Sequence, residues 1–191
     1  DRSSITTTGR GVISAAEQEK RRIGDLWIGQ LVERDMWTEA AQTCVKVLRS
    51  APRWEHWAWI FIKNNKIDEI SPYIPTNLHP SLPSLIYEVI LGHYVARNRI
   101  KLKELLDSWP LELFEANSVI EASKEQFKSG TVPSDSEDWR ILMSCIAKLY
   151  LAGGNYREAL HCYIQLQDAD TAMNIISEHR LLDAVADDIP A

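Results

Sequence analysis

Histidine and cysteine side chains are the residues of this sequence that could bind a metal ion. The histidines are dispersed and form neither an HxxxH nor an HExxH pair, the spacings that place two zinc ligands on one helix face. His161 beside Cys162 comes nearest to a ligand pair, but adjacent residues of a helix point about 100° apart. We therefore favour a packed cysteine over a metal site. The full set is His56, His79, His93, His161 and His179.

Cysteine usage indicates buried thiols in a reducing cytosol. The sequence has three cysteines, an odd number, and no CxxC motif. Each cysteine lies among apolar residues: Cys44, Cys145 and Cys162. Cys145 would be a nucleophile only with a nearby base, and we favour a structural role. No GxGxxG, GxxxxGKS/T or GxSxG motif occurs. We expect no enzyme activity, no catalytic residue, no metal and no cofactor.

Two small clusters have a structural interpretation. Gly153 and Gly154 are better explained as the C-terminal turn of a helix that needs a positive φ than as a phosphate-binding loop. Asp183, Asp187 and Asp188 resemble a carboxylate cluster, but we interpret them as a solvated helix end.

Tryptophan is abundant, with seven residues, and WEHWAWIF carries three of them within six positions. Trp54, Trp57 and Phe61 lie on one helical stripe and are expected in the core. Trp59 lies roughly 200° from Trp57 around the helix. It either meets the next repeat, which we favour, or is a hot spot for a partner. Trp59 is therefore the one residue we name as an interaction candidate.

The net charge and the hydropathy of the sequence limit which classes of partner we expect. The 191 residues carry a net charge of −6, and the basic residues are scattered along the sequence, which argues against nucleic acid or an anionic membrane as a partner. The sequence has no run of about 18 apolar residues that could span a membrane, and no charged and then apolar signal segment at its start. We expect a cytosolic protein that binds proteins and reaches a membrane only through them, without direct insertion.

Two segments divide the chain. Residues 1–12 (DRSSITTTGRGV) are polar and aperiodic and are expected to form a disordered tail. Residues 13–191 are expected to form one helical segment. The sequence does not begin with methionine and ends just after a helical pattern, so we interpret it as part of a larger protein.

Apolar residues recur with the 3.6-residue period of helices, and no alternation of period two supports a strand. The first two stripes are separated by only four residues, 34–37, which predicts an antiparallel hairpin. The stripes expected on one helix face are Ile23, Leu26, Trp27 and Leu31; then Ala40, Ala41, Cys44, Val45 and Leu48; and later Trp139, Leu142, Met143, Ile146, Leu149 and Tyr150.

An internal repeat organises these stripes. Residues 31–47 (LVERDMWTEAAQTCVKV) align with residues 150–166 (YLAGGNYREALHCYIQL), so that Trp37 matches Tyr156 and Ala40 matches Ala159. A small alanine lets two helices approach closely, and the aromatic residue fills the closed end of the hairpin. Stacked hairpins of this kind predict an all-α fold, an α-solenoid of antiparallel helical hairpins with degenerate tetratricopeptide-like repeats.

The order of several segments resembles a known family. LVERDMWTEAAQTC, EISPYIP (69–75), LIYEVIL (85–91) and LYLAGGNYREALHCYIQL are similar to the helical region, related to clathrin heavy-chain repeats, of the vacuolar protein sorting-associated protein 41 family. Its members are subunits of the homotypic fusion and vacuole protein sorting (HOPS) tethering complex. The resemblance runs from about residue 23 to residue 182.

The resemblance implies a non-catalytic scaffold in vesicle and endosome fusion with the vacuole or lysosome. The implied partners are other HOPS subunits and, through the parent protein, an adaptor complex and a Rab-type GTPase. The implied location is cytoplasmic, peripheral on late endosome and vacuole or lysosome membranes. Two alternatives stay open: a self-associating clathrin-like coat module, and an enzyme or metal protein whose site the sequence does not reveal.

Overall fold

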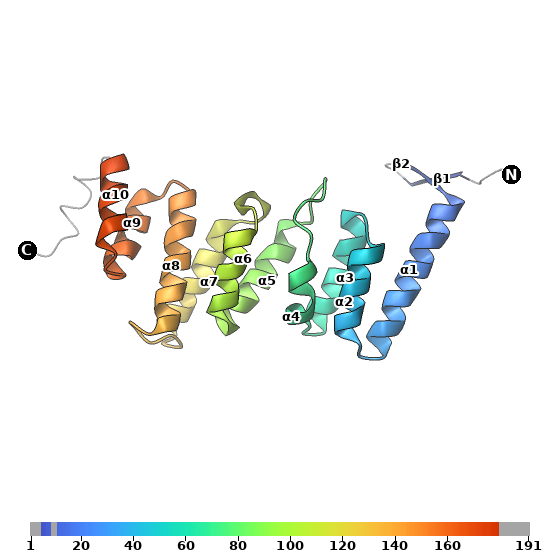
Figure 1. The fold of residues 1–191 in the computed structure, drawn as a ribbon, viewed down its shortest axis with the longest axis horizontal. Helices are drawn as coiled ribbons and strands as arrows, with labels where there is room; N and C mark the ends of the chain where they lie inside the picture. Colours follow the sequence, from blue (N-terminus) through green and yellow to red (C-terminus); the bar gives the residue numbers. More distant parts are fainter. Residues whose placement is uncertain (1–4, 9–10, 180–191) are drawn as a thin grey trace, which may run out of the picture. The chain divides into compact units, whose positions relative to one another are not determined.

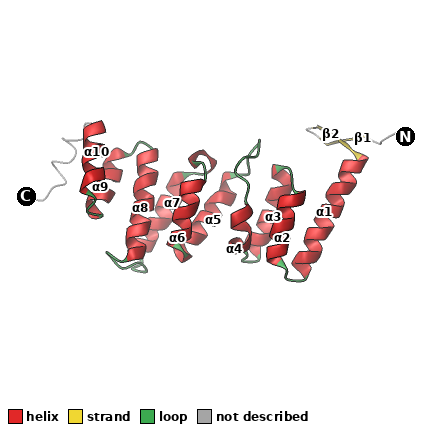
Figure 2. Ribbon diagram, in the orientation of Figure 1, coloured by secondary structure: helices red, strands yellow, loops and turns green. Residues whose placement is uncertain are grey.

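The chain folds almost entirely as helices. The computed structural model describes residues 5–8 and 11–179, with side chains from residue 13 onward. Within these ranges it contains ten α-helices, two short 3-10 helices and two short strands (Figure 2). The predicted all-α class of helices packed in sequential pairs is confirmed. The chain divides into two compact units, Asp1–Ile86 and Tyr87–Ala191, and each is described by itself.

A short β-hairpin precedes the first helix, where we had expected no strand. Strand β1 (Ile5–Thr8) pairs antiparallel with β2 (Gly11–Ser14), and Ile5 lies opposite Ser14. Isoleucine, threonine and valine favour extended backbone because their Cβ atoms are branched. Strands of four residues are too short to reveal an alternating pattern, so the sequence did not indicate them. The disordered tail at residues 1–12 stays a prediction.

The first unit is built from α1 (Ala15–Glu33), α2 (Trp37–Val47), α3 (Ala51–Lys63) and α4 (Ile67–Ile70), followed by the 3-10 turn η1 (Ser71–Tyr73). α1 and α2 form the predicted hairpin, and α4 packs against both α2 and α3 (Figure 1). Trp37 and Phe61 meet edge to face with ring centroids 5.1 Å apart in the core of this unit.

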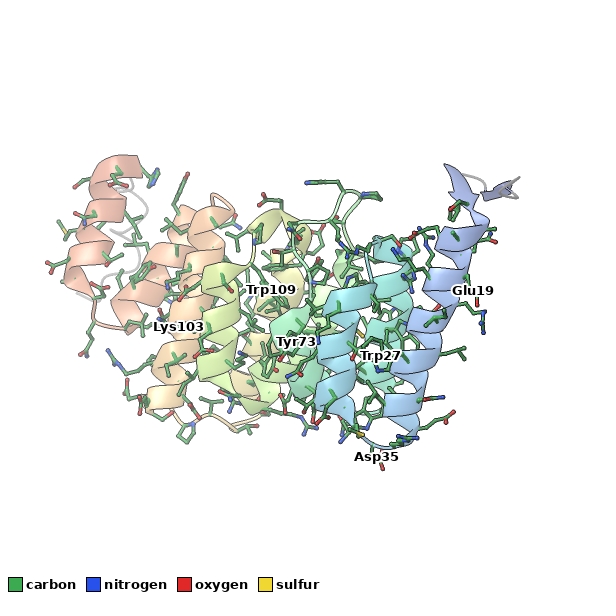
Figure 3. The ribbon with its side chains drawn as sticks, turned by 45° about the vertical axis from the view of Figure 1, so that its right-hand side comes forward. Glu19, Trp27, Asp35, Tyr73, Lys103 and Trp109 are labelled. Atoms are coloured by element: carbon green, nitrogen blue, oxygen red, sulfur yellow. The ribbon has the colours of Figure 1, made fainter. Side chains whose placement is uncertain are left out.

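The face of α1 that enters the core differs from the predicted one. Ile23, Leu26 and Trp27 are about half exposed, and the buried residues are Gly24 and Ile28. Gly24 faces the end of α2: a Cβ at Gly24 would lie 3.2 Å from the Cβ of Val47, so a larger residue there would require Val47 to shift slightly. Trp27 is labelled on α1 in Figure 3.

A similar correction applies to Val45 on α2. The sequence placed it in a core stripe, but its side chain is 51% exposed, whereas its neighbour Cys44 is fully buried. The period of apolar residues identifies a helix, but it does not decide which residues at the edge of the stripe are covered.

The second unit contains most of α5 (Ser84–Arg97), then α6 (Arg99–Ser108), the 3-10 turn η2 (Leu111–Leu113), α7 (Ala116–Lys128), α8 (Glu137–Ala152), α9 (Tyr156–Gln165) and α10 (Ala169–His179). α8 packs against α6, α7 and α9, and α9 packs against α10 (Figure 1). α8 thus contacts both of its sequence neighbours, α7 and α9, and also α6.

Polar contacts join the helices of the second unit. Arg99 of α6 donates to the side-chain oxygen of Gln126 on α7 at 2.8 Å and pairs with Asp138 of α8 at 3.7 Å. Lys148 of α8 donates to Asp107 of α6 at 3.1 Å. These contacts join α6 to both α7 and α8, and α7 itself packs against α8, as the candidate site requires.

Candidate interaction groove

A groove lies between α7, α8 and α9 in the second unit. It has a volume of about 420 Å³. Its floor is apolar: Met143, Ile146 and Cys162 are at least nine-tenths buried, and Phe127 and Tyr150 are half-buried along its sides. The complete lining is Lys124, Phe127, Met143, Ile146, Tyr150, Arg157, Glu158, His161, Cys162 and Gln165. We call it the α7–α9 groove.

The rim of the α7–α9 groove is polar. Lys124 lies over the Tyr150 ring, with its Nζ 5.9 Å from the centroid, and pairs with Glu121 at 3.3 Å. The Nε2 atoms of His161 and Gln165 are 3.0 Å apart on successive turns of α9. An apolar floor with polar groups at the edge suits a side chain or short segment of another protein.

The groove extends toward the connection between α7 and α8. A second hollow shares Phe127, Met143 and Gln165 with it and adds Ser134, Asp135 and Trp139. Phe127 and Trp139 lie with their ring centroids 6.4 Å apart at this junction. Aromatic side chains of this kind often contribute much of the binding energy at protein interfaces.

The three cysteine thiols of the chain are buried and have raised pKa values. Burial raises the pKa of Cys162 and of Cys145 to about 11 each, because the charged thiolate is poorly solvated there. Burial likewise raises the pKa of Cys44 in the first unit to about 12. All three cysteines are free thiols. At neutral pH they are protonated, and a protonated thiol is a poor nucleophile and a poor metal ligand.

The residues considered for metal binding do not gather. Among residues 5–8 and 11–179, no three histidine, cysteine, aspartate or glutamate side chains lie close enough to hold a metal ion together. His161 is exposed, whereas Cys162 beside it is buried. Asp183, Asp187 and Asp188 lie outside the described residues.

The tryptophan predictions have separate outcomes. Trp54 and Trp57 are buried, as the stripe predicted, and both indole N–H groups donate: Trp54 to the Leu48 carbonyl at 3.2 Å and Trp57 to Asp25 at 3.0 Å. Trp59 is half-buried and does not line the α7–α9 groove. Its role in an interaction therefore stays a prediction.

Sequence analysis missed the groove, although it had identified several of its residues. Met143 and Ile146 were expected in the core stripe of one helix and are buried there, and they also form the floor of the groove beside the half-buried Tyr150. The available signal was the polar series Arg157, His161 and Gln165, which recurs every four residues beside Cys162. His179 has a role that the sequence did not indicate: it stacks on Tyr156 with centroids 3.5 Å apart.

Within residues 5–8 and 11–179, no helix is both long enough and apolar enough to cross a bilayer.

Comparison with known proteins identifies the family. The model of one family, described as the Vps41 TPR-like region, matches residues 22–191. Curated relatives named vacuolar protein sorting-associated protein 41 homolog include those of human (32% identity over 168 residues), mouse (31% over 168) and Arabidopsis thaliana (30% over 168). These alignments cover 86–87% of the chain and 16–19% of the relatives. No solved structure matches significantly. The chain thus spans about a fifth of its relatives' length, and it belongs to the Vps41 TPR-like region family.

Proposed function

We propose that this chain is a non-catalytic scaffold and interaction segment of a membrane-tethering complex subunit. In this role it acts in the fusion of vesicles and endosomes with the vacuole or lysosome. Family membership supports the proposal, because the matched relatives are named for vacuolar protein sorting. The protonated thiols and the apolar groove support binding of proteins in preference to chemistry.

The α7–α9 groove is the observation that carries the proposal. Its floor of Met143, Ile146 and Cys162 offers apolar surface, and its rim of Lys124, His161 and Gln165 offers polar contacts that fix the orientation of a bound segment. The proposed partners are other subunits of the HOPS complex. Contacts with an adaptor complex or a Rab-type GTPase would be made through the parent protein.

The proposed location follows from these partners. The chain would be cytoplasmic and would sit on late endosome and vacuole or lysosome membranes through the proteins it binds. No direct contact with nucleic acid or insertion into a bilayer is part of the proposal.

A second candidate function is a self-associating coat module. The exposed apolar residues Ile23, Leu26 and Trp27 on α1 favour it, because unpaired apolar surface is a common element of interfaces between copies. Sedimentation of the purified chain separates the two functions. Oligomers that grow with concentration would support the coat module, and a strict monomer would exclude it.

The tethering function is tested in cells through the exposed rim of the groove. The double variant His161→Glu/Gln165→Glu, introduced into the full-length protein, is expected to recover less of the other tethering subunits by affinity purification. The matched control is Gln42→Glu/His56→Glu, which changes the same residue types at exposed positions of the first unit.

Delayed vesicle fusion with the vacuole or lysosome should accompany the loss of subunits in the groove variant alone. Equal recovery of subunits and equal fusion in the groove and control variants would exclude the groove as the binding site. The thermal unfolding midpoint of both variants should stay close to that of the wild type, because all four positions are exposed.

A further inference from the structure

A pocket in the first unit gathers cations that are scattered in the sequence. It has a volume of about 350 Å³ and lies where α1, the end of α2 and the start of α3 meet. Its lining consists of Glu17, Lys20, Arg21, Lys46, Val47, Arg49 and Arg53. Five cations and one carboxylate thus face a single pocket, although the whole chain has a net charge of −6. We call this site the basic pocket.

Arg53 holds the pocket together and is not free to bind a ligand. Its guanidinium donates to the Val47 carbonyl at 2.9 Å and to the Arg21 carbonyl at 3.2 Å. It also pairs with Asp25 at 3.2 Å, and its side chain is only 13% exposed. These bonds tie α3 to α1 and to the end of α2, and the other cations of the pocket lie on α1, on α2 and just before α3.

Three cations of the basic pocket have no acidic partner among the described residues. Glu17 pairs with Arg21 at 3.7 Å, whereas Lys20, Lys46 and Arg49 are exposed and unpaired. Several other exposed cations do have a carboxylate three or four positions away on the same helix, as in the pair of Lys103 with Asp107. What distinguishes Lys20, Lys46 and Arg49 is that all three line one pocket. Like charges that face one pocket repel one another unless an anion neutralises them.

The start of α3 adds to the positive potential. α3 has 13 residues and no acidic residue in its first turn, and the Ser50 side chain makes no capping hydrogen bond. The N-terminal end of a helix carries a partial positive charge, and this one lies beside Arg49. The cations and the helix end therefore favour the same kind of ligand.

We propose that the basic pocket binds an acidic linear segment of a partner protein. Carboxylates of such a segment would neutralise Lys20, Lys46 and Arg49. The apolar side chains beside them would pack on exposed α1 residues, since Ile23 and Trp27 follow Lys20 on one stripe of the helix. A recessed pocket next to apolar side chains suits a peptide with acidic and aliphatic residues. This site is separate from the α7–α9 groove.

Fluorescence anisotropy with the complete chain tests the proposal. The probe is a fluorescein-labelled peptide of alternating glutamate and leucine, with a phosphoserine version as a second probe. Lys46→Glu/Arg49→Glu is expected to weaken binding at least about tenfold. Added salt should weaken wild-type binding as well, because the Debye length is about 8 Å at physiological ionic strength.

The matched control is Arg34→Glu/Lys63→Glu, which reverses one arginine and one lysine at exposed positions of the same unit outside the pocket. Lys20→Glu on α1 is an independent second variant and should also weaken binding. The proposal is overturned if the peptides do not bind, or if the pocket and control variants bind equally. It is also overturned if vesicles containing phosphatidylserine bind through these cations while both peptides fail.

Discussion

Asp35 and Gly154 adopt the same left-handed backbone conformation, with φ of 56° and 77°, at equivalent positions of two helical hairpins. In each turn the third residue after the helix donates its N–H back to a helix carbonyl: Met36 to Leu31 at 2.9 Å, and Asn155 to Tyr150 at 2.8 Å. This is the Schellman arrangement, which satisfies carbonyls that the helix leaves unpaired. It recurs at Asn65 and Gln167.

The left-handed residue makes glycine the preferred residue of this turn. Gly154→Ala is expected to lower the free energy of unfolding by about 1 kcal/mol, because a Cβ is strained at positive φ. Gly153→Ala is the control, since its φ is −83° and its new Cβ would make only an ordinary contact of 3.4 Å. Urea denaturation followed by circular dichroism measures both. Equal losses in the two variants would exclude backbone strain as the cause.

The reverse change should stabilise another turn. Gln167 has a φ of 60° before α10, so Gln167→Gly is expected to raise the free energy of unfolding by at most about 1 kcal/mol. Gln165→Gly places the same substitution in the last residue of α9, where glycine is unfavourable, and should lower the free energy of unfolding by a similar amount. Thermal unfolding of both variants compares them, and a loss of stability in Gln167→Gly would count against the turn geometry.

The close approach of α8 and α9 depends on Ala159, the fourth residue of α9. Ala159 is fully buried, so Ala159→Leu is expected to cost about 1–3 kcal/mol of stability through overpacking. Ala152→Leu, on the exposed end of α8 in the same hairpin, should change stability by less than about 0.5 kcal/mol. Chemical denaturation distinguishes them, and a neutral Ala159→Leu would show that the helices can separate freely.

The buried Cys44 thiol gives the stability a pH dependence. Burial raises its pKa from about 9 to about 12, so the stabilisation is complete below pH 9 and is lost as the pH rises toward 12. At pH 10.5 the loss is about 2 kcal/mol for an ideal shift of this size.

Cys44→Ala removes this titration and serves as the comparison. The stability difference between the wild type and Cys44→Ala, measured by urea denaturation, should therefore shrink between pH 8 and pH 10.5. A difference that is constant with pH would contradict the raised pKa of the folded state.

The helical fold could be predicted from the sequence because its causes are local. The matching of Trp37 with Tyr156 and of Ala40 with Ala159 reflects one hairpin geometry, and burial of both alanines confirms it. Gly154 was expected to need a positive φ, and it does. Residues near one another in the chain determine each of these features, so the pattern of types and spacings is sufficient.

The surfaces could not be predicted, because they depend on contacts between distant residues. Ile23 and Trp27 have the spacing of core residues, but the face of α1 that packs inward is the one with Gly24 and Ile28. Lys20 and Lys46 are far apart in the sequence, so their convergence was not visible there. The α7–α9 groove likewise exists only because three helices place parts of their apolar stripes at one opening.

The most direct measurement of the proposed function is crosslinking mass spectrometry of the full-length protein within its tethering complex. Lys124 lies on the rim of the α7–α9 groove and carries an amine that a lysine-reactive reagent can modify. We expect crosslinks from Lys124 to another subunit, and their loss in the His161→Glu/Gln165→Glu variant. Crosslinks from this chain that reach only its own protein, with none to any other subunit, would contradict the interaction role.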